Sequence, residues 1–462
     1  MRVLLVVYDN DSYIHWFPQG TAYIAAALQR AGCQVTIYHQ DLHHSPSSAL
    51  TAYLDEREFD LVGLGVIAGY YQYRKMLEIA EAVNRSRRRP FFMLGGHGPS
   101  PEPEYFLRRT QADAVVIGEG EETVTELVQR LKEKRSLAGL AGVAYRDGDA
   151  VQVNERRPQI QDIDALPLPA YDLFPVEYYR LIRNAHATNA DFVMPILSGR
   201  GCPFECIFCY RMEHGLRIRS SEAIVDEMRL LNTDYGINYF NFSDELLISS
   251  AARAAEVSEA ILKSGMKVKW ACQGRLNYAK PELLALMKRA GCVFINYGIE
   301  ALDDEVLRRM NKCLTTAQIV TGIEATLASG ISPGFNIIFG NPGDSLESLN
   351  RGVEFLLKYD DGAQLRTIRP VTPYPGSPLY YQAMADGLLK DCEEFYETKH
   401  INSDLLAVNF TDLSDEEFHR ALLEANKKLI ANYYDRAVRQ TVEQAERLYL
   451  SADAGFRGFR QT

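Results

Sequence analysis

The chain has 462 residues, of which 47% are hydrophobic, and it carries a formal net charge of −11. A chain of this length exceeds what one hydrophobic core holds, so two or three domains are expected. The charge is spread along the sequence and dense basic stretches are short, which argues against nucleic acid as the main partner. The sequence contains no run of eighteen apolar residues and no signal-peptide pattern, which predicts a cytoplasmic protein without membrane insertion.

Residues 1–140 alternate short β-branched segments with amphipathic stretches. Strands are expected at 3–8, 34–38, 61–66, 91–94 and 114–118. Because helical stretches separate these strands and little polar alternation interrupts them, they predict a doubly wound, Rossmann-like, five-stranded parallel sheet. Glycines stand at several strand ends, where parallel sheets open their ligand crevice. This edge is therefore expected to bind a large flat or phosphate-bearing ligand.

Residues 141–185 read as a hairpin followed by a linker. Asp147-Gly148 lies between two short apolar runs, which is typical of a hairpin turn. The proline-rich stretch 163–175 disfavours any regular element. We therefore expect the domain boundary in this segment.

Residues 186–390 again alternate strands and helices. Strands are expected near 193–197, 239–243, 267–273, 293–298, 332–339 and 364–371. Six units are too few for a closed eight-stranded barrel, so the pattern predicts a partial (β/α)6 barrel with its site at the C-terminal ends of the strands. Residues 391–462 are expected to be a helical region, in which Ser414 and Glu417 form a capping box.

Three of the eight cysteines lie close together in "SGRGCPFECIFCY", directly after the first barrel strand: Cys202, Cys206 and Cys209. Thiolates suit iron–sulfur clusters or zinc, but structural zinc takes four protein ligands and usually two paired motifs. Three thiolates can hold three irons of a cubane and leave the fourth iron open to another ligand. The alternative is a solvent-exposed trio or a zinc knuckle. Four isolated cysteines are expected to be small buried hydrophobes: Cys272, Cys292, Cys313 and Cys392.

The spacing Cys-x3-Cys-x2-Cys, with Phe208 before the third cysteine, resembles the signature of the radical S-adenosylmethionine (SAM) superfamily. In that superfamily the open iron of a [4Fe-4S] cluster chelates the methionine amine and carboxylate of SAM. One electron from the cluster then cleaves the sulfonium to a 5′-deoxyadenosyl radical. The resemblance also implies an electron donor such as flavodoxin or ferredoxin.

Later motifs resemble the SAM-binding segments of the superfamily, strand by strand. "NFSDELL" resembles the segment that binds the methionine amine, Arg275 suits the methionine carboxylate, and Glu300 suits the ribose hydroxyls. Singly, each could be a salt-bridged acid or a plain turn, but their order and strand positions agree. The resemblance thus implies these SAM-binding residues: Phe208, Ser243, Asp244, Glu245, Arg275, Glu300, Ile338 and Gly340.

The motifs "VGLGV", "MLGGHG" and "VVIGEGEET" resemble the cobalamin-binding domain fused to a large radical SAM group that includes the anaerobic magnesium-protoporphyrin ester cyclase. Taken alone, "GEGEET" is also consistent with acids at the start of a helix. The cobalamin contacts that the resemblance implies are Tyr8, His15, Gly20, Gly65, Val66, Ile67, Gly95, Gly96, His97, Gly118, Glu119 and Gly120.

One segment departs from the pattern of cobalamin carriers. Classical carriers present Asp-x-His-x-x-Gly, whereas His15 in "DNDSYIHWFPQG" lies five residues before Gly20. Members of the fused group often lack this motif and bind the corrinoid without a lower histidine. His15 as cobalt ligand and His15 as a packed side chain both stay open, so the sequence does not assign the lower axial ligand.

The resemblance implies a cobalamin-dependent radical SAM enzyme. The leading hypothesis is C-methylation of an unactivated carbon in a small-molecule or natural-product substrate, through a 5′-deoxyadenosyl radical and methylcobalamin. The alternatives are cobalamin-assisted oxidation or ring formation without methyl transfer and, in another class, a non-catalytic redox or corrinoid sensor. The sequence identifies neither the substrate nor a catalytic residue.

Overall fold

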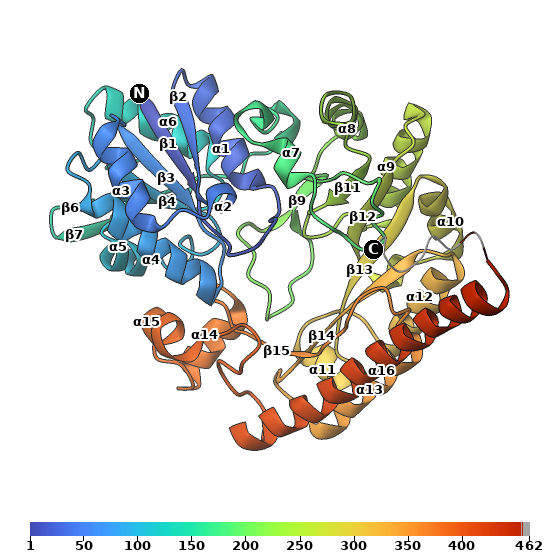
Figure 1. Ribbon diagram of the computed structural model, residues 1–462. Helices are drawn as coiled ribbons and strands as arrows, with labels where there is room; N and C mark the ends of the chain where they lie inside the picture. The colour runs from blue at the N-terminus through green and yellow to red at the C-terminus, as the bar shows by residue number, and fades with distance from the viewer. Residues whose placement is uncertain (454, 456–462) are drawn as a thin grey trace.

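The computed structural model describes residues 1–453 and 455 and contains two parallel sheets side by side (Figure 1). The N-terminal sheet has the order β2-β1-β3-β4-β5-β6-β7. Its strands are β1 (Arg2–Val7), β2 (Gln34–His39), β3 (Leu61–Gly65), β4 (Phe91–Gly95), β5 (Ala114–Val116), β6 (Val143–Asp147) and β7 (Ala150–Val153). Strands β1 to β5 pair in parallel, which confirms the predicted five-stranded core of this sheet.

The predicted hairpin forms and extends this sheet. Strand β6 pairs antiparallel with β5, with Ala114 opposite Tyr145, and β7 pairs antiparallel with β6. Val143 and Ala144 are fully buried in this arrangement, because the short β5 offers an open edge and apolar neighbours. The hairpin therefore belongs to the N-terminal sheet, and the proline-rich segment begins after it.

Helices cover both faces of the N-terminal sheet. They are α1 (Gln19–Arg30), α2 (Gln40–His43), α3 (Ser47–Glu56), α4 (Tyr70–Arg85), α5 (Pro103–Thr110) and α6 (Glu121–Lys132). Val3 and Leu5 of β1 pack into one apolar cluster with α1 and α6, whereas Leu4 and Val6 pack into a second cluster with α3, α4 and α5. Burial on both faces explains why the strand lacks polar alternation.

The proline-rich linker packs tightly against the N-terminal domain. It contains three short elements: η1 (Ile163–Ala165), η2 (Tyr171–Leu173) and α7 (Val176–Tyr179). The ring of Phe17 lies 5.3 Å from Tyr171, 5.2 Å from Phe174 and 5.6 Å from Tyr179. These aromatic contacts fix the path along which the chain enters the second sheet.

The second sheet is a partial barrel with the order β15-β14-β13-β12-β11-β8 and parallel pairing throughout, as predicted. Its strands are β8 (Val193–Ile196), β11 (Tyr239–Phe242), β12 (Lys269–Gly274), β13 (Cys292–Glu300), β14 (Ser332–Phe339) and β15 (Arg369–Pro370). The connecting elements are α8 (Ser221–Tyr235), α9 (Ala251–Ser264), η3 (Leu276–Tyr278), α10 (Pro281–Arg289), α11 (Asp304–Arg309), α12 (Thr316–Ala328) and α13 (Leu346–Tyr359).

A small antiparallel ribbon that was not predicted follows β8. It consists of β9 (Gly199–Cys202) and β10 (Gly215–Ile218), and the loop between these strands carries Cys206 and Cys209. A Cβ atom on Gly199 would lie 2.7 Å from the carbonyl oxygen of Arg217, and one on Gly201 would lie 2.3 Å from that of Gly215. The two glycines therefore permit the close pairing that forms this ribbon.

The C-terminal region divides between the two sheets. Helix α14 (Pro378–Ala385), helix α15 (Cys392–Glu394) and the π-helical turn η4 (Phe395–Lys399) pack against the N-terminal domain. Helix α16 (Asp415–Leu450) runs along α13 on the outside of the barrel (Figure 1). The capping box of Ser414 and Glu417 starts α16 as predicted. In the described part of the chain, no helix has the length and apolar character needed to cross a membrane.

Tyr396 of η4 carries much of the contact between the C-terminal region and the N-terminal domain. Its ring is buried and stacks on Tyr73 of α4 at 4.6 Å. Changing Tyr396 to Ala is expected to cost roughly 3–5 kcal/mol of unfolding free energy, as for other large core aromatics. Urea unfolding followed by fluorescence measures the loss. Tyr449→Ala, at a side chain that is 75% exposed, is the control and is expected to change stability by less than about 0.5 kcal/mol. Equal effects of the two changes contradict the packing argument.

Candidate active site

A cavity of about 990 Å³ lies between the two sheets. On one side it is bounded by the C-terminal ends of β1, β3, β4 and β5, and on the other by barrel strands β8, β11, β12, β13 and β14. The twelve residues predicted as cobalamin contacts, from Tyr8 to Gly120, all line this cavity. The predicted ligand crevice of the N-terminal sheet therefore opens toward the barrel.

The glycines at the strand ends form a surface that a flat ligand can approach closely. Gly96 has φ 93°, and a Cβ atom there would lie 2.6 Å from the carbonyl oxygen of Val66. Gly118 has φ 77°, and a Cβ atom there would lie 2.5 Å from a carboxylate oxygen of Glu213. Side chains at these positions would be strained and would fill the crevice, so glycine keeps the backbone open to a corrin ring.

The two candidate histidines both face the cavity. Nδ1 of His15 lies 3.4 Å from the carbonyl oxygen of Trp16, so this ring is partly engaged by the backbone. Surrounding protein lowers the pKa of His97 through desolvation, although the nearby carboxylate of Glu245 opposes the shift. The ring of His97 also meets the edge of Tyr210 at 5.9 Å. A neutral imidazole is the form that ligates metals or accepts hydrogen bonds, so both residues stay candidates for contact with a corrinoid.

The three clustered cysteines lie near one another on and after β9. Burial, together with charge on Cys206 and Cys202, raises the pKa of Cys209 to about 11. Burial also raises the pKa of Cys206, whereas the cations Lys312 and Arg275 lower it. These cations fit a cofactor whose thiolate ligands carry net negative charge.

The arrangement of the thiols suits a cubane. Among residues 1–453 and 455, no three His, Cys, Asp or Glu side chains are grouped as ligands of one metal ion. In a cubane each thiolate binds a different iron, so the thiolates need not converge on one point. The buried, cation-flanked loop is therefore compatible with the predicted [4Fe-4S] cluster, which Cys202, Cys206 and Cys209 would hold.

Arg275 and Lys312 connect the cysteine loop to the barrel. The Arg275 guanidinium donates to the carbonyl oxygens of Lys312 and Cys313 at 2.6 and 3.0 Å, and it lies 3.5 Å from the ring centre of Phe204. Nζ of Lys312 forms an ion pair of 2.9 Å with Glu300 and lies 5.7 Å from the ring centre of Phe208. Three residues predicted from the SAM motifs, Phe208, Arg275 and Glu300, are thus gathered around this loop.

The segment after β11 places its three polar residues differently. Asp244 is buried, accepts hydrogen bonds from the backbone and hydroxyl of Ser198, and has its pKa raised to about 7 by burial. Glu245 accepts from the backbone of Gly201 at 3.1 Å, and Ser243 donates to Gln19 of the N-terminal domain at 2.5 Å. Ser243 and Glu245 line the cavity, whereas the Asp244 carboxylate is directed at Ser198.

Ile338 and Gly340 lie at the end of β14, outside the lining of the large cavity. The backbone N–H of Gly340 donates to Asp344 at 3.1 Å. A Cβ atom on Gly340 would lie 2.9 Å from the ring of Phe418 in α16. The contribution of this segment to SAM binding stays a prediction from the resemblance.

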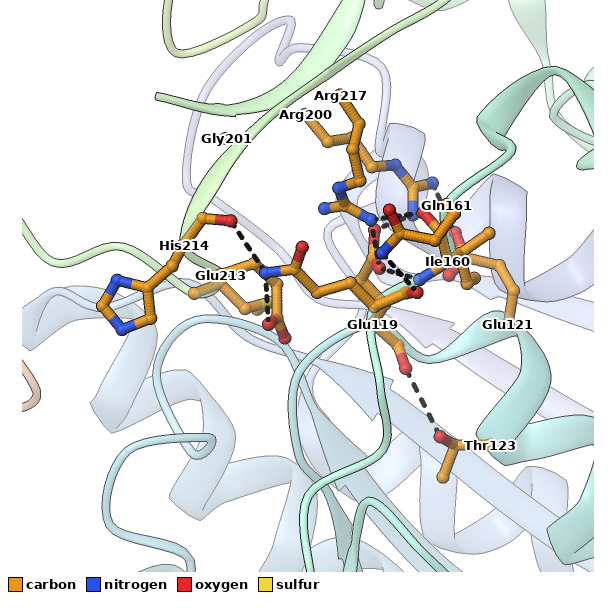
Figure 2. Close-up of polar contacts among 12 residues, drawn as sticks. Glu119, Glu121, Thr123, Ile160, Gln161, Arg200, Gly201, Glu213, His214 and Arg217 are labelled. Atoms are coloured by element: carbon orange, nitrogen blue, oxygen red, sulfur yellow. Dashed lines mark hydrogen bonds and ion pairs between the residues drawn. The ribbon is translucent and has the colours of Figure 1, made fainter. Parts of the chain in front are cut away.

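A buried ionic cluster joins the two domains, and the sequence did not predict it (Figure 2). Arg200 and Arg217 lie directly opposite each other on β9 and β10, where like charges repel. The Glu119 carboxylate accepts from Arg200 at 2.9 Å, from Arg217 at 2.6 Å and from the backbone of Ile160 at 3.0 Å. Arg200 also pairs with Glu121 at 2.5 Å. Glu119 of the N-terminal domain thereby compensates the charges of the ribbon that begins the cysteine loop.

The isolated cysteines divide into two groups. Cys272, Cys292 and Cys392 are buried as predicted, and Cys33 is buried as well. Cys313 is exposed, so the prediction of burial is wrong for this residue. It sits in a tight turn with φ 52°, where its carbonyl oxygen accepts from Arg275 and its side chain is left outside the core.

The geometry agrees with comparisons to known proteins. The model of the Radical SAM superfamily matches residues 196–356, and the model of the B12 binding domain matches residues 6–128. An uncharacterized methyltransferase of Pyrococcus horikoshii is 31% identical over 401 residues, which are 84% of this chain and 84% of that protein. The anaerobic magnesium-protoporphyrin IX monomethyl ester cyclase of Rubrivivax gelatinosus is 27% identical over 80% of this chain and 66% of its own length.

A solved structure shares the fold. The radical SAM methyltransferase TsrM of Kitasatospora setae, with cobalamin and a [4Fe-4S] cluster bound, superposes with a TM-score of 0.72 at 19% identity. The match covers 93% of this chain and 88% of TsrM. The arrangement of an N-terminal parallel sheet beside a partial barrel is therefore that of a cobalamin-binding radical SAM protein.

We expect each of the changes Cys202→Ala, Cys206→Ala and Cys209→Ala to abolish cluster binding, because two thiolates and an open corner do not retain a cubane. Cluster binding is measured by the iron and sulfide content and the visible absorbance of protein reconstituted without oxygen. Cys313 lies beside the loop, but its thiol is exposed to solvent. The control variant Cys313→Ala is therefore expected to keep full iron content. Normal iron content in all three loop variants contradicts the assignment.

Glu119→Gln is expected to destabilise the contact between the domains by roughly 3–5 kcal/mol, because it removes the carboxylate partner of Arg217 and leaves Arg200 with Glu121 alone. Burial disfavours the Glu119 carboxylate, but hydrogen bonds from Arg217 and Arg200 outweigh burial and lower its pKa. A lowered pKa in the folded state means that this stability is present above the ordinary carboxyl pKa and is lost as pH falls through the lowered value. The difference in unfolding free energy between the wild type and Glu119→Gln should therefore become smaller in acid.

Urea unfolding at several pH values measures the effect of Glu119→Gln. The control is Glu122→Gln in the same motif, where the carboxylate is 52% exposed and lies 3.9 Å from Arg157. This control is expected to change stability by less than about 1 kcal/mol. A similar loss in both variants, or a gap that is constant with pH, contradicts the proposed role of the buried pair.

Proposed function

We propose that this chain, which belongs to the radical SAM enzymes that carry a B12-binding domain, transfers a methyl group to an unactivated carbon of a small molecule. The observation that carries the proposal is a cavity lined by both domains. Its N-terminal wall is the glycine-rich edge predicted to bind cobalamin, and its opposite wall is the barrel interior. A methyl donor and a substrate bound there would share one cavity.

When bound, cobalamin supplies a transferable methyl group, and the cluster with SAM supplies the radical that activates a carbon. The chain's own residues position these groups and exclude water. Burial of Cys206 shields the loop, and Lys312 and Arg275 balance its negative charge. The Glu119 carboxylate holds the ribbon of Arg200 and Arg217 against the glycine-rich edge, which keeps the two halves of the chamber in register.

Similarity to a methyltransferase of Pyrococcus horikoshii over most of both chains supports methyl transfer. The family membership also makes this chain an enzyme, which sets aside the hypothesis of a non-catalytic sensor. An electron donor such as flavodoxin or ferredoxin stays part of the proposal, because the radical step requires one electron.

A second candidate is oxidation or ring formation without methyl transfer. Similarity to the magnesium-protoporphyrin ester cyclase of Rubrivivax gelatinosus favours it. The same cavity and the same cofactors serve both reactions, and the fate of the methyl group separates them.

The test supplies SAM with an isotopically labelled methyl group to the anaerobically reconstituted enzyme, together with a reductant, cobalamin and candidate substrates. We expect 5′-deoxyadenosine and a labelled product, followed by mass spectrometry. Cys206→Ala is the negative control and should yield neither. Substrate-dependent formation of 5′-deoxyadenosine with no label in any product contradicts methyl transfer and supports the oxidative alternative.

A further inference from the structure

The barrel wall that faces the cavity carries an unusual row of amide side chains. Asn241, Gln273, Asn296 and Asn336 project from β11, β12, β13 and β14, and all four line the cavity. Central strands of a parallel sheet are normally apolar on both sides. Asn336 is exposed in the middle of β14, where its neighbours Phe335 and Ile337 are buried. These amides therefore face a space that suits a polar ligand.

The packing around Asn296 keeps this row open. Gln273 and Asn296 are direct neighbours across β12 and β13, and the amide of Asn296 donates to Gln273 at 2.9 Å. The next position in the register is Gly334 of β14, where a Cβ atom would lie 2.3 Å from Oδ1 of Asn296. A larger residue at 334 would displace the amide, so glycine leaves room for Asn296 beside the cavity.

Arg366 lies at the deep end of this wall. It is 8% exposed, lines the cavity, and donates to Oε1 of Gln364 at 2.7 Å and to the carbonyl oxygen of Pro333 at 3.3 Å. Its Nε has no hydrogen-bond partner among the described residues, and the nearest carboxylate oxygen, on Asp360, is 3.9 Å away. Each terminal nitrogen makes one of these hydrogen bonds and keeps one further N–H for a ligand, whereas Nε is buried beside Asp360.

The position of Arg366 also sets an orientation. Its guanidinium lies 5.9 Å from the ring centre of Phe294 and 5.5 Å from that of Phe335, near the N-terminal ends of β13 and β14. Glu300, which pairs with Lys312 at the cysteine loop, ends β13 six residues after Phe294. At the rise of a strand this separation is roughly 20 Å. Arg366 and the cysteine loop therefore occupy opposite ends of the barrel.

We propose that the barrel end of the cavity is the substrate site and that Arg366 binds an oxyanion, a carboxylate or a phosphate, on a small polar substrate. Arg366 is the cationic side chain among the described residues that line the cavity from β11 to β15, and a guanidinium matches both groups through paired hydrogen bonds. The amide row lines the space beside Arg366, where the rest of the substrate would lie. This inference rests on the proposed function, of which it names the substrate class.

Binding of three probes that share a phenyl ring tests the inference: benzoate, its neutral isostere benzamide, and phenyl phosphate. Calorimetry uses the full chain with its cofactors, under anaerobic conditions. We expect the wild type to bind benzoate or phenyl phosphate about tenfold more tightly than benzamide, and the stronger of the two identifies the oxyanion. Arg366→Gln should abolish the preference, and Arg366→Lys should retain part of it. Equal binding of all three probes by the wild type, or an unchanged preference in Arg366→Gln, overturns the proposal.

Two further variants guard against a folding artefact. Asn336→Asp has nearly the same shape at an exposed position, and it is expected to weaken benzoate binding while benzamide binding is unchanged. Arg229→Gln removes a positive charge from the outer surface of α8, where the side chain is 53% exposed, and should bind all probes as the wild type does. If Asn336→Asp weakens the binding of benzoate and of benzamide equally, the result contradicts an electrostatic site.

The outcome is separate from that of methyl transfer. If the wild type shows no preference for the anionic probes and a neutral product is labelled, only the proposed substrate class is overturned. Retained preference together with absent labelling overturns the proposed reaction and leaves the oxyanion site standing.

Discussion

The contact of one carboxylate with two facing arginines underlies the architecture of the site. Arg200 and Arg217 stand opposite each other on the ribbon that begins the cysteine loop, and they repel unless an acid lies between them. Glu119, from the glycine-rich edge of the other domain, provides that charge while remaining almost fully buried (Figure 2). Desolvated charges are costly when unpaired, so both arginines depend on this carboxylate once the domains are docked. The contact brings the predicted cobalamin edge and the ribbon of β9 and β10 to the same cavity.

The rest of the cavity follows from that constraint. Glycines at the ends of β4 and β5 leave backbone rather than side chains facing the barrel. The barrel is open between its edge strands β8 and β15, and the linker and the N-terminal domain pack beside it (Figure 1). The C-terminal region completes the assembly: η4 stacks on α4, and α16 packs along α13. One chain thus forms a cavity between two chemically different walls.

The cysteine loop and the barrel wall of the cavity differ in chemistry. The cysteine loop combines one buried and two half-buried thiols with the cations Arg275 and Lys312. The barrel wall contains Arg366 and a row of amides, which suit recognition of a polar, anionic molecule. Polar side chains are uncommon on the strands of a parallel barrel, so this wall supports the proposed ligand site.

The sequence by itself determined the order of strands and helices, the two parallel sheets, the cysteine loop and the glycine edge, because these depend on local periodicity and on the spacing of nearby residues. It also located all twelve residues predicted on the N-terminal wall of the cavity. Only the tertiary structure decided which distant residues meet: Glu119 with Arg200 and Arg217, the hairpin with β5, and Arg366 with the cavity. It also decided that Cys313 is exposed. Such contacts depend on strand register and domain docking, which no local pattern encodes.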